Sequence, residues 1–353
     1  MGLELDTGAV RAVQLRGTVR KAVVVAMGQV EIPETAVAGG AVAEVNAVAE
    51  ALERLWVEAR IGSREVVLGV PEQGILMRLG VFPKVPESKL GQALRYQAGD
   101  YFPIPLPQLV LDYSVVGEVE REEGPGLEVL MVAARRDLLD RSIEALTAAR
   151  LTPRVADAPT LALLRNLSEV QLGGTVALVN VCNGSSSLLL VSRGIPRFAR
   201  VMPVSLQDCA RERSCGLQDV VPRAVPPRPL AAMAAGAGAE PAGGAALAGW
   251  EWPVEVSVPL GEWGMVLVNE IRSSISYFLA QRDVGAIDLL VLGGRGARVP
   301  GLADFLRTEL QMKVEVVQPP AVMPAAGAVA ARMQAEWPDF AVSAGLALRG
   351  LEA

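Results

Sequence analysis

Three short turns hold the residues in this chain whose types and spacing suit chemistry. Residues 6–8 read Asp-Thr-Gly, residues 183–187 read Asn-Gly-Ser-Ser-Ser, and residues 293–296 include three glycines. Each turn follows an apolar run, as expected after a buried strand. Glycine lacks a Cβ, so the backbone of such a turn can approach a ligand closely. The pattern indicates a phosphate or nucleotide site, and it fits turns that serve only the fold equally well.

The side chains at these turns also have plainer interpretations. Asp6 and Thr7 suit the cap of a hairpin as well as contact with phosphate. Residues 185–187 suit turn positions as well as phosphate ligands, and Cys182 suits a small core residue better than a reactive thiol. Glu270 lies on a predicted helix, where it suits a solvated face as well as a ligand contact. The residues alone leave these alternatives open.

Composition excludes several classes of site. The chain has no histidine, which excludes Ser-His-Asp and Cys-His catalysis and any histidine-ligated metal. Its three cysteines, Cys182, Cys209 and Cys215, lack metal-ligand spacing and fit a reducing compartment. The net charge of -6, with lysine and arginine scattered along the chain, argues against nucleic-acid binding.

Length and hydropathy predict a protein with two domains and large cores. The chain has 353 residues, of which 51% are hydrophobic, and its mean hydropathy is +0.34. No apolar run reaches the ~20 residues that a membrane span needs. No charged-then-apolar signal peptide opens the sequence. We therefore expect a cytoplasmic protein with no direct insertion into a membrane.

Hydrophobic periodicity predicts the elements that would position the turns. The first unit has a hairpin within residues 2–15, a strand at 23–30, a helix at 42–59 and a strand at 66–70. The strand, turn, strand, strand order recurs at 176–181, 188–191 and 196–203. The third turn lies between a strand at 287–292 and a helix at 302–310, and a strand follows at 314–317. Two similar α/β halves with a cleft between them favour a ligand site.

Four further segments complete the prediction. Residues 76–149 are predicted to be an inserted α+β subdomain, with paired strands at 110–119 and 127–134 and helices at 89–100 and 136–149. Residues 222–249, rich in Pro, Ala and Gly, are predicted to be a flexible linker. A long helix is predicted at 260–281, and a short one at 341–351 closes the chain.

Several longer stretches resemble the PilM family of type IV pilus assembly proteins, which is related to the cell-division protein FtsA. The inserted segment carries the most specific match, through YFPIPL after Asp100 and AARRDLL after Val132. The other stretches are GLELDTGAVRAVQL from Gly2, NEIRSSISYF from Asn269, LLVLGGRGARVPGLADFL from Leu289 and SAGLALRGL from Ser343. The resemblance as a whole extends over nearly the whole chain except residues 209–260.

The resemblance implies an α/β, actin-like (ribonuclease H-like) two-domain fold with an inserted α+β subdomain. The first half would be residues 1–75 with 150–170, the insertion 76–149, and the second half 171–205 with 260–353. Residues 206–259 would be a degenerate region that includes the linker. ATP, with Mg²⁺, would lie between the halves. The implied nucleotide residues are Glu4, Asp6, Thr7, Gly8, Arg11, Asn180, Asn183, Gly184, Ser185, Ser186, Glu270, Gly293, Gly294, Arg295 and Gly296.

Departures from the family pattern favour weak or absent nucleotide binding and no hydrolysis. The first loop of the family reads Asp-apolar-Gly, whereas Asp6 stands here in the place of the glycine. A carboxylate that lies about 4 Å from a phosphate charge is repelled by ~4 kcal/mol at an effective dielectric constant of 20. The second loop should also begin with Asp, and Asn180 is a neutral amide. The glycine turn at 293–296 is intact.

Three functions compete at this stage. The first is a scaffold at the inner membrane that binds the cytoplasmic N-terminal tail of a PilN-like protein and contacts other platform proteins of a pilus, competence or secretion system. The second is an active actin-like or sugar-kinase-like ATPase, and the third is an FtsA-like membrane tether. The scaffold is favoured. The altered loops argue against an ATPase, and the lack of an evident terminal amphipathic helix argues against a membrane tether. Its predicted peptide groove is formed by Leu79, Val81, Leu94, Tyr101 and Phe102.

Overall fold

The first half of the chain is built on a five-stranded sheet. The computed structural model describes residues 1–121, 124–221, 260–281, 286–320 and 323–352. The strand order is β10-β6-β1-β2-β3, with β1 antiparallel to β2 and parallel to β6. The strands are β1 (Gly2–Asp6), β2 (Ala9–Arg16), β3 (Val23–Glu31), β6 (Glu65–Gly69) and β10 (Thr152–Asp157). All five residues of β1 are buried, as expected for a central strand covered on both faces.

A second sheet repeats this arrangement. Its order is β13-β12-β11-β14-β15, with β11 antiparallel to β12 and parallel to β14. The strands are β11 (Thr175–Val181), β12 (Ser186–Ser192), β13 (Ile195–Met202), β14 (Leu289–Gly293) and β15 (Val314–Val316). Two hairpin strands, a third antiparallel strand and two parallel strands thus occur in the same order twice. The internal duplication predicted from the sequence is confirmed.

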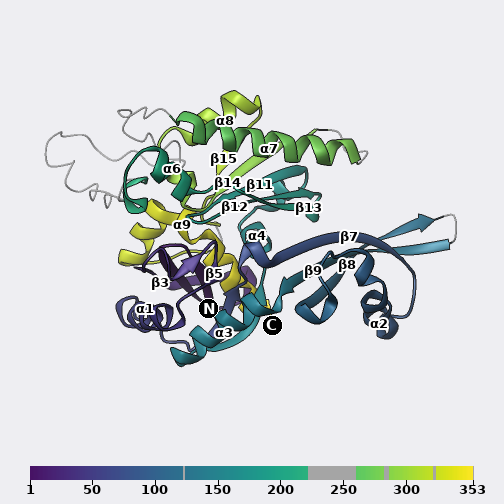
Figure 1. The fold of residues 1–353 in the computed structure, drawn as a ribbon, viewed down its shortest axis with the longest axis horizontal. Coiled ribbons are helices and arrows are strands. Elements are labelled where there is room, and N and C mark those ends of the chain that lie inside the picture. The colour runs from purple at the N-terminus through teal and green to yellow at the C-terminus, as the bar shows by residue number, and fades with distance from the viewer. Residues whose placement is uncertain (122–123, 222–259, 282–285, 321–322, 353) are drawn as a thin grey trace, which may run out of the picture.

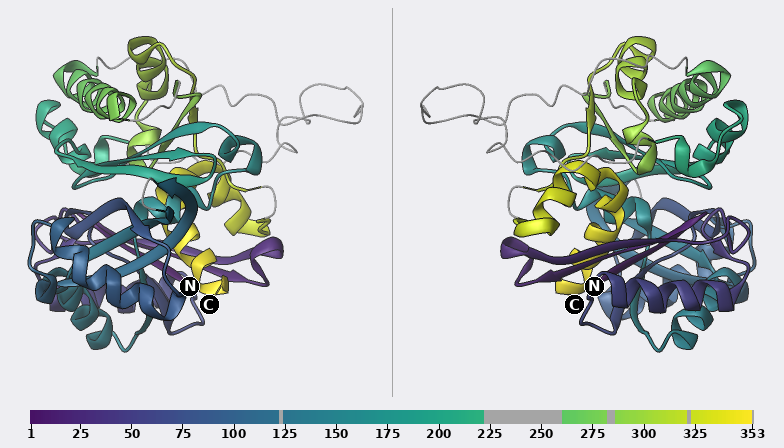
Figure 2. Two further views of the ribbon diagram at one scale, coloured as in Figure 1. Left: turned by 90° about the vertical axis from the view of Figure 1, so that its right-hand side faces the viewer. Right: turned by 90° about the vertical axis from the view of Figure 1, so that its left-hand side faces the viewer.

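Helices form three layers around the two sheets (Figures 1 and 2). Outside the first sheet lie α1 (Val45–Glu58) and α3 (Arg136–Ala148). Outside the second lie α6 (Leu206–Glu212), α7 (Gly261–Gln281) and α8 (Leu302–Leu310). Between the sheets lie α4 (Pro159–Leu164) and α9 (Gly327–Glu352), whose apolar side chains share one core with both sheets. The shorter elements are α5 (Glu169–Leu172), β4 (Val37–Ala38), β5 (Ala41–Val42) and the 3-10 turns η1 (Val19–Lys21), η2 (Glu72–Gly74), η3 (Ala98–Asp100), η4 (Leu106–Gln108), η5 (Leu217–Asp219) and η7 (Arg295–Arg298).

A three-stranded antiparallel sheet projects from the first half, seen at the right of Figure 1. Its order is β7-β9-β8, with β7 (Ile75–Pro83), β8 (Leu109–Arg121) and β9 (Gly124–Arg135). Helix α2 (Glu87–Gln97) covers one face and encloses a separate small core. The predicted strands and helix of the insertion are therefore present. Helix α3 packs instead against α1 and the core of the first sheet, which favours ending the insertion before α3.

Two predictions from the sequence need comment. The closing helix was predicted at 341–351, whereas α9 begins at Gly327 and continues through Pro338. Proline lacks the N–H of a helical bond and usually interrupts a helix, but Trp337 and Phe340 on either side are anchored in the core between the sheets.

The linker predicted at 222–249 lies outside the described residues. Among the helices that the structure describes, none is long and apolar enough to cross a membrane.

Candidate functional site

The corresponding hairpin turns of the two halves meet directly. The turn between β1 and β2 contains Thr7, and the turn between β11 and β12 contains Asn183. The amide N–H of Asn183 donates to Asp6 Oδ2 at 3.2 Å, and its side-chain Nδ2 donates to the carbonyl of Thr7 at 2.7 Å. A Cβ on Gly184 would lie 2.1 Å from Thr7 Oγ1. The duplicated topology therefore places the two turns in direct contact.

A buried arginine neutralises the acidic side of this contact. Arg11 lies opposite Glu4 on β1 and opposite Gln29 on β3, so strand register places the three side chains in one row. Its Nη1 lies 2.9 Å from Asp6 Oδ2 and 3.8 Å from Glu4 Oε2, and its Nε donates to Gln29 Oε1 at 2.8 Å. Burial lowers the pKa of Arg11, but Asp6 and Glu4 outweigh this effect and raise it. The guanidinium therefore stays charged although it is 1% exposed.

The glycine turn after β14 packs against the protein itself. Gly294 has a φ of 74°, a conformation that favours glycine. A Cβ there would lie 2.6 Å from Asn180 Oδ1, and a Cβ on Gly296 would lie 2.3 Å from Val181 Cγ1. A Cβ on Gly293 would meet Leu163 of α4 at 2.9 Å. The close approach that these glycines permit is therefore an approach to neighbouring segments of the chain.

Arg295 connects this turn to the two hairpins. Its Nη2 donates to the carbonyl of Gln218 at 3.0 Å, and its Nη1 lies 3.5 Å from Asn183 Oδ1. Gln218 in turn reaches the carbonyl of Gly8 at 3.5 Å, at the limit of a hydrogen bond. Burial lowers the pKa of Arg295. The three turns predicted from the sequence are thus brought together by side chains of this protein.

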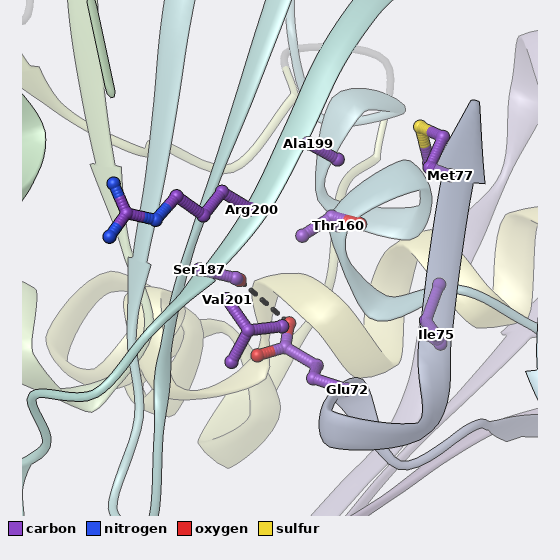
Figure 3. A pocket seen from close by; sticks show the side chains of 8 residues that line it. All are labelled: Glu72, Ile75, Met77, Thr160, Ser187, Ala199, Arg200 and Val201. Carbon is purple, nitrogen blue, oxygen red and sulfur yellow. Dashed lines mark hydrogen bonds between the residues drawn. The ribbon is translucent and has the colours of Figure 1, made fainter. Parts of the chain in front are cut away.

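Sequence reasoning missed Glu72, which forms a second connection between the halves. It lies in the η2 turn after β6, and its Oε1 accepts hydrogen bonds from Ser187 Oγ at 2.8 Å and from Asn180 Nδ2 at 3.4 Å. Burial raises the pKa of Glu72 to about 7. Figure 3 shows its carboxylate directed toward Ser187, with the guanidinium of Arg200 pointing away. The side chain borders a cavity that is lined by Glu72, Ile75, Met77, Thr160, Ser187, Ala199, Arg200 and Val201.

The other residues of the implied nucleotide set are more dispersed. Ser185 and Ser186 are buried in the second hairpin. Glu270 on α7 forms an ion pair of 2.8 Å with Arg200 on β13, so it is bound to the second sheet. Ser274, one turn further along α7, accepts a hydrogen bond from the same arginine. This pairing accounts for Glu270 without a nucleobase.

The five residues of the predicted peptide groove differ in exposure. Leu94 is 0% exposed and Phe102 is 4% exposed, because both belong to the core between α2 and its sheet. Leu79 and Tyr101 are half-buried, and Val81 is 41% exposed. Leu94 and Phe102 therefore stabilise the insertion from inside and do not line a surface groove.

The residues at the junction do not fit a triphosphate or a metal ion in this arrangement. Glu4, Asp6 and Cys182 each place one potential ligand atom within 4.8 Å of the others. Arg11 already pairs with both carboxylates. Burial raises the pKa of the Cys182 thiol well above its usual range, which disfavours the thiolate that binds metals. A triphosphate between the hairpins would have to displace the hydrogen bonds of Asn183.

Comparison with known families decides where the chain belongs. The family described as type IV pilus assembly protein PilM matches residues 2–200 and 249–351. The chain belongs to the PilM family. The match includes both hairpin turns, the insertion, the glycine turn and nearly all of α9, so it covers the junction described above except Gln218. The resemblance inferred from the sequence is confirmed.

Solved structures support the same assignment. A chain of a PilM–PilN type IV pilus biogenesis complex superimposes with a TM-score of 0.77 and is 27% identical, covering 100% of this chain and 98% of that chain. The ethanolamine utilization protein EutJ from Carboxydothermus hydrogenoformans has a TM-score of 0.50 and 12% identity, covering 98% of this chain and 88% of that one, which bears on the fold alone. This PilM-family protein has the actin-like α/β fold, with two duplicated halves and an inserted α+β subdomain.

Proposed function

We propose that this PilM-family protein is a cytoplasmic scaffold of a type IV pilus or related inner-membrane platform. It binds the N-terminal cytoplasmic tail of a PilN-like membrane protein and reaches the membrane through that partner. The observation that carries the proposal is the similarity, along the whole chain, to a protein solved as a PilM–PilN complex. Contacts with other proteins of the platform belong to the same proposal.

The edge strand β8 is the part of the insertion best suited to receive an extended peptide. It lies at one edge of the order β7-β9-β8. Residues 112–115 are exposed without interruption, although the Tyr113 hydroxyl lies near Gly91 of α2, where an added Cβ would lie 3.0 Å from it. Tyr113 is 36% exposed and Val115 is 45% exposed. An open edge offers main-chain hydrogen bonds, and apolar side chains beside it add affinity and selectivity.

Catalysis is not part of the proposed function. Asn180 stands where the family pattern has a carboxylate, and its Nδ2 donates to Glu72. Asp6 accepts hydrogen bonds from Arg11 and from two backbone amides, so its oxygens are already in use. We therefore propose that binding of ATP is weak or absent and that binding of the tail does not need it.

Calorimetry with a synthetic peptide of about the first dozen residues of the cognate tail tests the scaffold. We expect a dissociation constant in the micromolar range, near -8 kcal/mol, without added ATP. Val115→Lys should weaken binding by about tenfold, because it places a charge in the apolar contact. Val25→Lys is the matched control, since Val25 is 37% exposed on the edge strand β3 of the other sheet.

The possible outcomes distinguish a failure of the scaffold proposal from a failure of the proposed docking site on β8. Absence of heat, together with an unchanged melting temperature at a large excess of peptide, would refute the scaffold proposal. Full binding by the Val115→Lys variant would instead overturn only the placement on β8. Equal weakening in both valine variants would show an effect of charge alone.

A further inference from the structure

Contacts between the two halves converge on a few polar groups at the hairpin turns. Asn183 of the second half donates to Asp6 and Thr7 of the first. Ser187 and Asn180 of the second half donate to Glu72 of the first. Each set joins residues more than 100 positions apart in sequence. The halves are therefore linked twice by hydrogen bonds that need no other molecule.

Charge at this junction is also balanced from within the chain. Two acids, Glu4 and Asp6, face one guanidinium, Arg11, whose Nη1 lies 2.9 Å from Asp6 Oδ2 and 3.8 Å from Glu4 Oε2. A buried carboxylate pair of this kind otherwise requires a cation or a proton. Arg11 supplies the cation, and burial also raises the pKa of Glu4 above its usual range.

We propose that Asp6, Arg11 and Asn183 form a permanent clasp that closes the cleft between the halves and replaces the nucleotide and cation implied by the fold. Asp6 is the centre of the clasp, because its Oδ2 accepts from Arg11 on its own side and from Asn183 on the other. The proposal goes beyond scaffold function, since it concerns how the shape of the protein is maintained. It holds whether or not the protein binds a PilN-like tail.

The glycine beside Asn183 supports the clasp independently. The space that a side chain would need at Gly184 is already taken by Thr7 Oγ1, and the amide of Gly39 donates to that same hydroxyl at 3.0 Å. Thr7 is 1% exposed and Asn183 is 0% exposed. Hydrogen bonds at such a buried contact are costly to leave unmade. Opening the cleft would expose all of these groups together.

The first arm of the test asks whether nucleotide is needed for closure. The purified full chain is heated with and without millimolar Mg-ATP, and amide hydrogen exchange is followed at residues 6–8 and 182–186. We expect no shift in melting temperature and no added protection. A rise of several degrees, as a ligand well above its dissociation constant produces, would overturn the proposal.

The second arm weakens the clasp with Asn183→Ala, which removes the side-chain bond to Thr7, keeps the backbone N–H bond to Asp6 and leaves strand residues intact. Exchange should rise by about tenfold at residues 6–8 as well as at 182–186, because both turns lose one shared contact. Arg154→Ala is the matched control, since its ion pair with Glu65 is exposed and lies within the first half. A rise confined to residues 182–186 would overturn the proposal.

The third arm tests the guanidinium itself. Arg11→Ala should loosen both turns, and free guanidinium at low millimolar concentration should restore protection by filling the vacated position. Restoration by Mg²⁺ in place of guanidinium would show a metal site and overturn the proposal. If Arg11→Ala does not fold, the Asn183→Ala result decides the question alone.

Discussion

Buried ionisable side chains at the junction make stability depend on pH. Glu72 is 8% exposed, and burial raises its pKa from 4.5 to about 7 in the folded protein. The folded state therefore holds its proton more tightly than the unfolded state does. The stabilisation is complete below about pH 4.5 and is lost as the pH rises through about 7.

Glu72→Gln should remove this dependence, because an amide keeps an acceptor for Ser187 and has no charge to bury. Relative to the native chain, the variant should gain on the order of 3 kcal/mol of unfolding free energy at pH 8 and little at pH 4. Urea unfolding between pH 4 and pH 8 measures this difference in unfolding free energy. Glu53→Gln on the exposed side of α1 is the control. Parallel pH profiles for the native chain and Glu72→Gln would contradict the prediction.

A second residue-scale prediction concerns the small core under α2. Leu94 is fully buried there, so Leu94→Arg should destabilise the insertion by at least about 3 kcal/mol, through a lost apolar contact and a buried charge. Hydrogen exchange in β7, β8 and β9 should increase. Tyr96→Arg, on the same helix at a position 92% exposed, should leave exchange unchanged. Similar exchange in both variants would count against the assignment of Leu94 to the core.

At the scale of single residues, the sequence predicted which side chains lie at the junction better than it predicted the residues to which they hydrogen-bond. Asp6, Thr7 and Asn183 lie at the junction, as their turn patterns indicated. The bond between Arg11 and Asp6 was not foreseen, although an arginine inside the apolar run of β2 is a recognisable sign of a buried partner. Glu72 gave no local signal, because its partners are more than 100 residues away.

Helix α9 is the element that joins the two sheets. Trp337 is 1% exposed and Phe340 is 0% exposed, and both lie in the core that includes strands of both halves. Asp339, between them, forms a buried ion pair of 2.7 Å with Arg298 of η7. One helix therefore contacts the first sheet, the second sheet and the segment after the glycine turn.

Trp337→Ala tests this role. Truncating a buried tryptophan should cost about 3–5 kcal/mol, because neighbours fill the cavity only in part. Denaturant unfolding measures the loss, and exchange should rise in β2 and β11 together, since both strands contribute side chains to this core. Gln334→Ala on the exposed side of α9 should change stability by less than about 0.5 kcal/mol. A response limited to one sheet would show that α9 belongs to a single half.

Elements with clear periodicity were predicted well, and α9 shows why others were not. Strands β1, β2 and β11 and helices α1 and α7 match their predicted ranges to within a few residues. The first turns of α9 consist largely of alanine and carry few apolar anchors, and Pro338 suggested a start that tertiary packing overrides. The closing of the chain on the first sheet depends on long-range contacts that no local pattern contains.

On the scale of the whole molecule, duplication explains why the junction exists. Two sheets with the same strand order are stacked with α4 and α9 between them (Figure 2). Hydrogen bonds join their equivalent hairpin turns. At these turns Arg11 pairs with Asp6 and Asn183 donates to Thr7, so side chains of this chain join the two halves. The inserted sheet projects from the two stacked sheets (Figure 1), and the proposed peptide site on β8 lies on this projection.

The packing of β1 against α9 also fixes an order of events during synthesis. A Cβ on Gly2 would lie 2.0 Å from the carbonyl of Ser343, so the first strand and this late helix are in intimate contact. Ribosomes add about 5–20 residues per second, so α9 is completed on the order of 20–60 s after β1. Until then an apolar face of the nascent sheet stays open to water. The first half can therefore complete its packing only after α9 has been synthesised.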